Sequence, residues 1–242
     1  ITAFLSIYDF SMAWKNQRWS PANYSAHFSE NEISASGQHI NLSILTEALL
    51  ATDALPDQGQ RALKGYYPTG RLKNIELYIP QNQNTGGVDP SPLFQLDANL
   101  DDVSLAAVGG APSASGMTGF LSLSDAQGAV FVDSDNFTLA FPNLFLDGWH
   151  FEKSQVIVNW DIDASGDVTV SSEGINLFLT EDTLVFGDFW LLLSDVEDDI
   201  LSLKVGLENL DALRTYQLVP SYLVSPGIYN WLKSSLKGGV VD

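Results

Sequence analysis

Three histidines are the side chains in this sequence best suited to acid–base or metal chemistry, and their spacing supports neither. His27, His39 and His150 lie far apart, and none has the spacing of metal ligands. The chain has no cysteine, which excludes a thiolate metal site, a disulfide framework and a cysteine nucleophile. The serine-hydrolase, zinc-protease and phosphate-loop motifs are also absent. We therefore predict a protein that is not an enzyme, with no catalytic residue, no metal and no cofactor.

One segment comes close to a metal-binding motif. Residues 161–173, DIDASGDVTVSSE, match the first half of an EF-hand calcium loop. The twelfth position, which needs a bidentate acid, is Ser172, and Glu173 comes one residue too late. Apolar/polar alternation also continues through the segment, where an EF-hand requires flanking helices. The sequence therefore predicts a tight hairpin turn here, with calcium binding as the alternative.

Carboxylates and aromatic rings could also bind or cleave a carbohydrate. An acidic run lies between two apolar strands, where a solvated turn is the simplest interpretation: Asp195, Glu197, Asp198 and Asp199. Sequence spacing alone does not bring two carboxylates together for glycoside hydrolysis. Most aromatic residues fall on the apolar side of the strand pattern, and Trp190 is the main candidate for a ring on the polar side.

The charge of the chain excludes several partners. Its 30 acidic and 11 basic residues give a net charge of −19. Such a charge argues against nucleic acid, whose phosphates require basic partners. It also argues against electrostatic docking on an anionic lipid surface. No window reaches the ~18–20 continuous apolar residues that a membrane-spanning helix needs. Both ends of the sequence look cut, and we expect a fragment of a longer protein.

The elements that must position any binding surface are short strands in apolar/polar alternation, which fill most of the sequence from Leu93 to Leu207. Val156, Val158 and Trp160 alternate with polar residues, and Ile157 is the one exception in that strand. A period of two places alternate side chains on opposite faces of a strand. Glycine-containing turns join the strands, and no crossover helices separate them, so the pattern predicts an antiparallel meander with one apolar face.

Helices are expected in two places. Asn41 or Ser43 can cap a helix within 43–65, and Pro56 opens a second short helix that continues to Leu63. A turn is expected at residues 68–70, before a strand that carries alternating apolar residues. The second helical region spans 209–237, where Ser225 is the expected N-cap. A polar loop at 81–92 separates two predicted parts, residues 1–80 with strands and helices and residues 93–242 with the repeated strands, and we expect the two parts to form one continuous structural unit.

Three stretches of the sequence resemble a known family. In residues 207–242 a strand leads to a short helix and a YLP-type element, and then to a helix with a Trp-Leu pair and a final Gly-Gly. The residues that carry these features are Tyr216 to Pro220, Pro226, Trp231, Leu232, Gly238 and Gly239. Residues 66–77 and 94–134 resemble a P-x-G-x-L strand start and a repeated strand–loop–hairpin unit. The chain is similar in these features to the YhdP branch of the bacterial AsmA-like (AsmA/TamB-type) envelope proteins. Leu218-Val219-Pro220 departs from the family's tighter spacing.

The resemblance implies an all-β fold with an elongated, curved antiparallel sheet that forms a groove, and a few short helices. It also implies a periplasmic protein that is tethered to the inner membrane by a helix outside this sequence. Family members are implicated in phospholipid passage to the outer membrane and in envelope integrity, and no catalytic residues carry over.

We therefore expect the apolar face to be the working surface. Roughly thirty apolar side chains share it by period-two alternation, and two helical segments are too few to cover them. The expected ligand is a phospholipid or another acyl-chain lipid, and the free edge strands of a fragment invite self-association. The candidate groove-lining residues are Phe94, Leu96, Phe137, Leu139, Phe141, Val156, Val158, Trp160, Ile162, Leu177, Leu179, Leu201, Leu203 and Val205. The alternative is a structural or carbohydrate-binding β-sandwich with a dry core.

Overall fold

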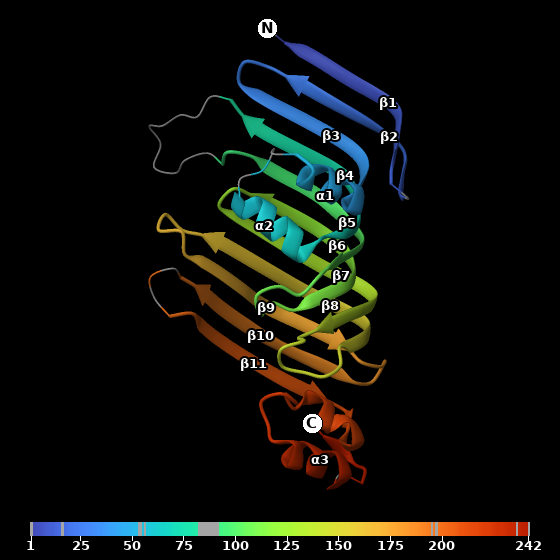
Figure 1. The fold of residues 1–242 in the computed structure, drawn as a ribbon, viewed down its shortest axis with the longest axis vertical. Helices are drawn as coiled ribbons and strands as arrows, with labels where there is room; N and C mark the ends of the chain where they lie inside the picture. The colour runs from blue at the N-terminus through green and yellow to red at the C-terminus, as the bar shows by residue number, and fades with distance from the viewer. Residues whose placement is uncertain are drawn as a thin grey trace.

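Eleven strands follow one another in chain order in one antiparallel sheet (Figure 1). The computed structural model describes residues 2–15, 17–52, 55, 57–81, 92–194, 196, 198–235 and 237–241. The strands are β1 (Ala3–Trp14), β2 (Gln17–Phe28), β3 (Glu32–Asn41), β4 (Thr69–Pro80), β5 (Gln95–Leu105), β6 (Ser113–Ser124), β7 (Gln127–Ala140), β8 (Trp149–Ile162), β9 (Val168–Phe178), β10 (Leu184–Leu193) and β11 (Ile200–Glu208). The expected all-β fold with an elongated, curved antiparallel sheet is confirmed, and the sheet is open.

Two helices lie between β3 and β4, and a small C-terminal unit follows β11. The helices are α1 (Leu42–Leu50) and α2 (Asp57–Tyr66). Asn41 is the N-cap of α1, because its side chain accepts a hydrogen bond of 3.0 Å from the backbone N–H of Ile44. The C-terminal unit contains β12 (Leu210–Asp211), the 3-10 helix η1 (Ala212–Leu218), α3 (Pro226–Ser235) and β13 (Val240–Val241). Helices in both expected regions are thereby confirmed, and Pro56 lies outside the described residues.

The inner face of the sheet is the face on which α1 packs. Leu42 of α1 belongs to one cluster of buried side chains with residues of β4 to β10, and the sheet members are Leu72, Ile75, Ala98, Leu100, Val103, Met117, Val132, Phe137, Phe151, Leu177 and Val185. Alternate residues of the same strands point to the opposite, outer face. Apolar burial therefore holds one face of the sheet together along most of its length.

Several strands bend where a residue with positive φ interrupts the alternation. Asn74 in β4, Asp102 in β5 and Asn136 in β7 have φ of 49°, 53° and 60°. Asparagine and aspartate tolerate this left-handed conformation better than other non-glycine residues. Register shifts accompany the first two of these positions, and β-bulges bend a strand and increase its twist. The interruptions explain why the sheet curves rather than remaining flat.

The start of β4 differs from the sequence-based prediction. A turn was expected at Pro68-Thr69-Gly70, but β4 begins at Thr69 and already pairs with β5 there. Gly70 has φ of 93°, and a Cβ at this position would collide with the carbonyl of Asp102. Glycine is thus required by the close approach of two strands and does not mark a chain reversal. Because β4 pairs with β5, the sheet also continues past the loop between the two predicted parts, most of which lies outside the described residues.

Candidate functional site

A row of side chains without a polar member crosses the inner face of all eleven strands. Each residue pairs directly with the next one on the neighbouring strand, and directly opposed residues share a face. In order from β1 to β11 the row, which we call the apolar row, is Leu5, Ala26, Ala35, Leu77, Leu96, Leu123, Gly128, Trp160, Val170, Leu191 and Leu201. No single strand of the sequence reveals this continuity, because the register of ten strand pairs produces it.

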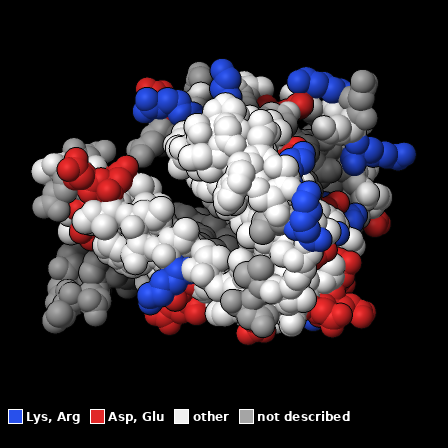
Figure 2. Space-filling model, turned by 90° about the horizontal axis from the view of Figure 1, so that it is seen from below, with Lys and Arg blue, Asp and Glu red and all other residues white. Residues whose placement is uncertain are grey.

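The inner face is least covered on β11. Leu201, Leu203 and Val205 have 58–62% of their surface exposed. They pair with Leu191, Phe189 and Gly187 of β10, which places them on the inner face. Seen from the β11 end, the molecule is hollowed between an arm on the left and a central mass of uncharged side chains (Figure 2). Among the described residues, no helix or strand covers these three side chains.

The structure places the fourteen predicted groove residues on or next to the inner face. Leu96, Val156, Val158, Trp160 and Leu139 are half-buried there. Ile162 and the three β11 residues are exposed, whereas Phe137 and Leu177 are fully buried in the core. Leu179 packs against the core just after β9, Phe94 directly precedes β5, and Phe141 follows β7 and contacts Trp149. Their role in lining a lipid groove stays a prediction.

An aromatic cluster on the first strands was not predicted. Phe10, Trp19 and Tyr24 lie with ring centroids 5.9–6.4 Å apart in edge-to-face arrangements. The Trp19 indole donates to the Tyr24 hydroxyl at 2.8 Å, and that hydroxyl donates to the carbonyl of His39 at 2.6 Å. Burial raises the pKa of Tyr24. Tyr24 lies over Gly37, where a Cβ would collide with the ring, and this pairing across β2 and β3 depends on the strand register, which the sequence alone does not give.

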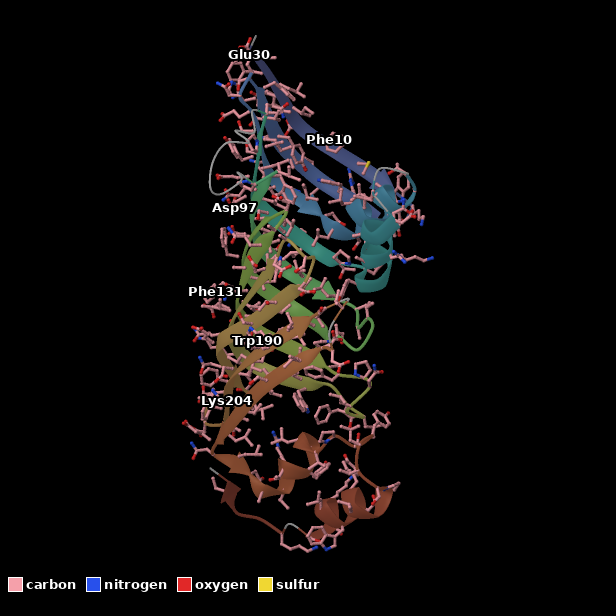
Figure 3. All side chains as sticks on the ribbon, turned by 90° about the vertical axis from the view of Figure 1, so that its left-hand side faces the viewer. Phe10, Glu30, Asp97, Phe131, Trp190 and Lys204 are labelled. Atoms are coloured by element: carbon pink, nitrogen blue, oxygen red, sulfur yellow. The ribbon has the colours of Figure 1, made fainter. Side chains whose placement is uncertain are left out.

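The outer face is less polar than the alternation suggested. Phe120, Phe131 and Ile157 pair in succession across β6, β7 and β8, and each is 41–45% exposed. Figure 3 shows Phe131 on the side of the sheet away from the helices. Trp190 also lies on the outer face, between Ser171 and Ser202, and is partly exposed as expected. The sequence predicts Ile157 as the exception to the alternation in its strand, and Phe120 and Phe131 extend this exception to two neighbouring strands.

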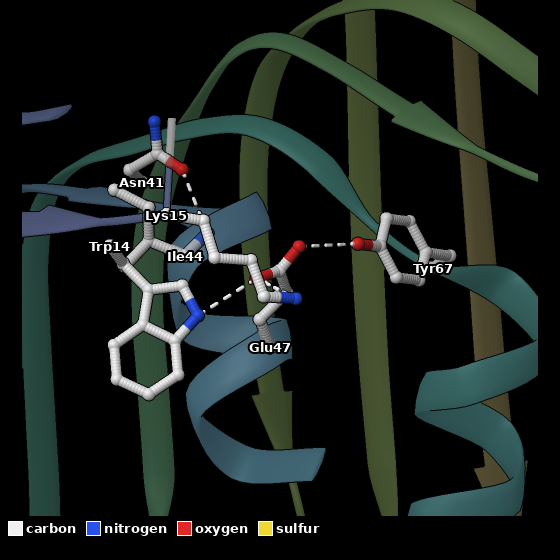
Figure 4. A network of polar contacts seen from close by, with 6 residues as sticks. All are labelled: Trp14, Lys15, Asn41, Ile44, Glu47 and Tyr67. Atoms are coloured by element: carbon white, nitrogen blue, oxygen red, sulfur yellow. Dashed lines mark hydrogen bonds and ion pairs between the residues drawn. The ribbon is translucent and has the colours of Figure 1, made fainter. Parts of the chain in front are cut away.

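A polar network fastens α1 to the first hairpin (Figure 4). One carboxylate oxygen of Glu47 accepts from the Trp14 indole at 2.8 Å and lies 3.0 Å from the Lys15 ammonium. The other oxygen accepts from the Tyr67 hydroxyl at 3.1 Å. The Lys15 ammonium is the main cause of a lowered pKa at Glu47, and the hydrogen bond to Glu47 raises the pKa of Tyr67. The network holds α1 over the inner face between the first hairpin and β4.

The three histidines lie in separate places and do not come together in one site. His27 lies 3.9 Å from Glu32, His39 contacts the carbonyl of Ser20, and His150 contacts the Thr138 hydroxyl. No group of three or more His, Cys, Asp or Glu side chains among the described residues could hold a metal ion. No described helix is long and apolar enough to cross a membrane.

The calcium-like segment forms the predicted hairpin turn. One oxygen of Asp163 accepts from the hydroxyl and backbone N–H of Ser165 and from the backbone N–H of Asp167. These bonds, that of the Ser165 hydroxyl first, lower the pKa of Asp163. In the acidic run, Asp199 accepts from the backbone N–H of Ser194, whereas Asp195 and Glu197 lie outside the described residues.

Comparison with known proteins gives one match. A family model described as YhdP protein matches residues 5–242, which is nearly the whole chain. Among curated proteins no match was found. Among solved structures no match was found either.

Proposed function

Because the chain belongs to the YhdP protein family, we propose that its inner face binds the acyl chains of a phospholipid or another acyl-chain lipid. In this proposal the chain is a non-catalytic module of a periplasmic protein that is tethered to the inner membrane. It serves phospholipid transfer between the inner and outer membranes, and thereby envelope integrity. The lipid contacts in this proposal are the candidate groove residues other than Phe137 and Leu177, which are buried in the core.

The observation that carries the proposal is the apolar row across all eleven strands. Soluble monomers rarely expose contiguous apolar patches larger than a few hundred Å². Each buried methylene of an acyl chain contributes about 0.8 kcal/mol, so a chain laid along the row gains affinity with its length. Leu201 of the row is exposed, as are Leu203 and Val205 beside it on β11, which keeps the row accessible at one end of the sheet.

The alternative of a dry β-sandwich has less support. A sandwich requires a second sheet that packs face to face about 10 Å away. The described part of the chain holds the eleven-stranded sheet and a separate two-stranded sheet of β12 and β13. Two strands of two residues each are too small to cover the inner face.

Neighbouring residues on opposite faces of β11 give the sharpest test. Leu203→Asp places a carboxylate on the inner face, and Ser202→Asp places the same group on the outer face as the matched control. Both positions lie on an exposed edge strand, so we expect the stability change to stay within about 0.5 kcal/mol. Native mass spectrometry after incubation with phospholipid vesicles should show about tenfold less bound lipid for Leu203→Asp only. A wild-type protein that binds no lipid contradicts the proposal, as does equal binding by both variants.

A further inference from the structure

A cavity of about 170 Å³ lies where the C-terminal unit meets the loop between β7 and β8. Its walls come from Phe145 to His150, from Leu179, and from η1 and α3. A single water needs only ~10–15 Å³, so the cavity has room for a small polar group. None of its residues belongs to the Glu47 network or to the apolar row.

One wall of the cavity is continuous with the inner face. Trp149 and Leu179 line the cavity and also pack against the hydrophobic core. Trp149 pairs with Leu139, a candidate groove residue, and therefore points to the same face. A molecule whose apolar part lies on the inner face can reach the cavity without leaving the protein surface.

The lining of the cavity carries one charge of each sign. Arg214 of η1 and Asp147 of the β7–β8 loop both line the cavity. No ion pair joins either side chain to another residue of the described ranges, so neither charge neutralises the other directly. Ser221, between η1 and α3, also lines the cavity.

The residues around the cavity are held in place by specific contacts. Asp211 caps η1 by accepting from the backbone N–H of Leu213 at 2.9 Å, which fixes the helix that carries Arg214. The backbone N–H of Tyr222 donates to the carbonyl of Leu144 at 3.2 Å, which joins the C-terminal unit to the loop. Tyr229 lines the cavity and stacks edge-to-face on Tyr216 at 6.0 Å.

We infer that this cavity binds a zwitterionic phosphoethanolamine headgroup, with the Arg214 guanidinium on the phosphate and the Asp147 carboxylate on the ammonium. Arginine suits phosphate because its donors match the oxygens in a fork geometry. The Trp149 and Tyr229 rings add faces that attract an ammonium group. The inference rests on the proposed lipid function and narrows the ligand to a phospholipid whose headgroup has one charge of each sign.

The test compares lipids that differ only in the headgroup. The delipidated protein is incubated with dioleoyl phosphatidylethanolamine, dioleoyl phosphatidylglycerol or dioleoylglycerol, and bound lipid is measured by native mass spectrometry. We expect the ethanolamine lipid to bind about tenfold more tightly than the other two. Soluble glycerophosphoethanolamine should compete with the ethanolamine lipid but not with dioleoylglycerol, which separates headgroup recognition from acyl-chain binding.

Two variants assign the charges. Arg214→Gln should reduce binding of dioleoyl phosphatidylethanolamine to the level of dioleoylglycerol. Asp147→Asn should remove the advantage of dioleoyl phosphatidylethanolamine over dioleoyl phosphatidylglycerol. Both side chains are exposed, so the variants should fold, and Arg61→Gln on α2 is the matched control. Equal wild-type binding of all three lipids overturns the headgroup site and leaves the proposed function intact. Absence of binding to all three overturns both.

Discussion

Glu47 shows how one carboxylate sets the position of a helix. It joins Trp14 and Lys15 at the end of the first hairpin to Tyr67, which precedes β4. Trp14 lies 33 residues before Glu47 in the sequence, and Tyr67 lies 20 residues after it. Surface ion pairs contribute little by themselves, so the geometric effect of three partners on one carboxylate matters more than their energy.

The network predicts a specific acid sensitivity. The pKa of Glu47 is lowered in the folded protein, so its stabilising contribution is present above the ordinary value of 4.5 and is lost as the pH falls through the folded value. Glu47→Gln should therefore melt lower than wild type at pH 7, and the difference should shrink below pH 4. Thermal melts by circular dichroism between pH 3 and pH 8 measure this.

The exposed Glu152 in β8 provides the control for that experiment. Glu152→Gln changes the same chemical group on the sheet without removing a network. It should melt close to wild type over the whole pH range. A Glu47→Gln difference that stays constant down to pH 3 contradicts the assignment of the acid sensitivity to this carboxylate.

At the scale of the elements, positive-φ residues in the strands determine the curvature. Asn136→Gly should keep the bend, because glycine adopts this conformation without strain. Asn136→Val should destabilise the protein by about 1–2 kcal/mol, because a β-branched residue is strained at positive φ. The nearby Asp133→Val substitution serves as the control, since Asp133 is exposed in the same strand and is not among the positive-φ residues. Urea denaturation measures the three variants, and equal midpoints for the two valine variants contradict the interpretation.

The strands themselves could be predicted from the sequence, but the bends could not. Alternation identified the segments around Val156, Leu177 and Leu203 because a period of two is visible within one strand. The positive φ of Asn74 and Asn136 depends on how neighbouring strands approach, which no local pattern contains. Gly70 was interpreted as a turn for the same reason, since glycine serves both turns and close strand contacts.

Helix ends were more predictable than the surroundings of the helices. Asn41 caps α1, and the Ser225 hydroxyl accepts from the backbone N–H of Ile228, as their residue types suggested. In α3, however, Ile228 and Trp231 form an apolar stripe that is largely exposed. Capping depends on three or four neighbouring residues, whereas burial depends on which element packs alongside.

At the scale of the whole molecule, one part of the candidate site could be predicted from the sequence and another part could not. The inner-face residues could be predicted from alternation, because the apolar side of each strand is visible in the sequence of that strand alone. The cavity with Arg214 and Asp147 did not, because these residues are more than sixty positions apart and meet only where the C-terminal unit contacts the β7–β8 loop. Long-range contacts of this kind leave no periodic signal in a single sequence.

Charge is also distributed unevenly over the whole molecule. In a meander, every second connection lies at the same end of the strands. The connections that follow β2, β4, β6, β8 and β10 contain no Lys or Arg in the sequence. Figure 2 accordingly shows acidic side chains at the left and lower side, and basic side chains at the top and right. Because each copy of the chain carries a net charge of −19, two copies repel each other at low ionic strength, where the Debye length reaches about 30 Å.

This repulsion opposes the pairing that the edges of the sheet favour. The outer edges of β1 and β11 pair with no strand among the described residues, and unpaired edges are templates for another strand. We therefore expect the isolated chain to be monomeric at about 10 mM salt and to associate at about 500 mM salt, where screening reduces the Debye length to a few Å. Ser6→Pro in β1 and Ser202→Pro in β11 each place a proline, which disfavours strand pairing, in one edge strand, so the double variant should stay monomeric at both salt concentrations. Sedimentation velocity measures the mass, and circular dichroism confirms that the double variant retains its strands. Association of that variant at high salt, or equal association of wild type at both concentrations, contradicts edge pairing limited by charge.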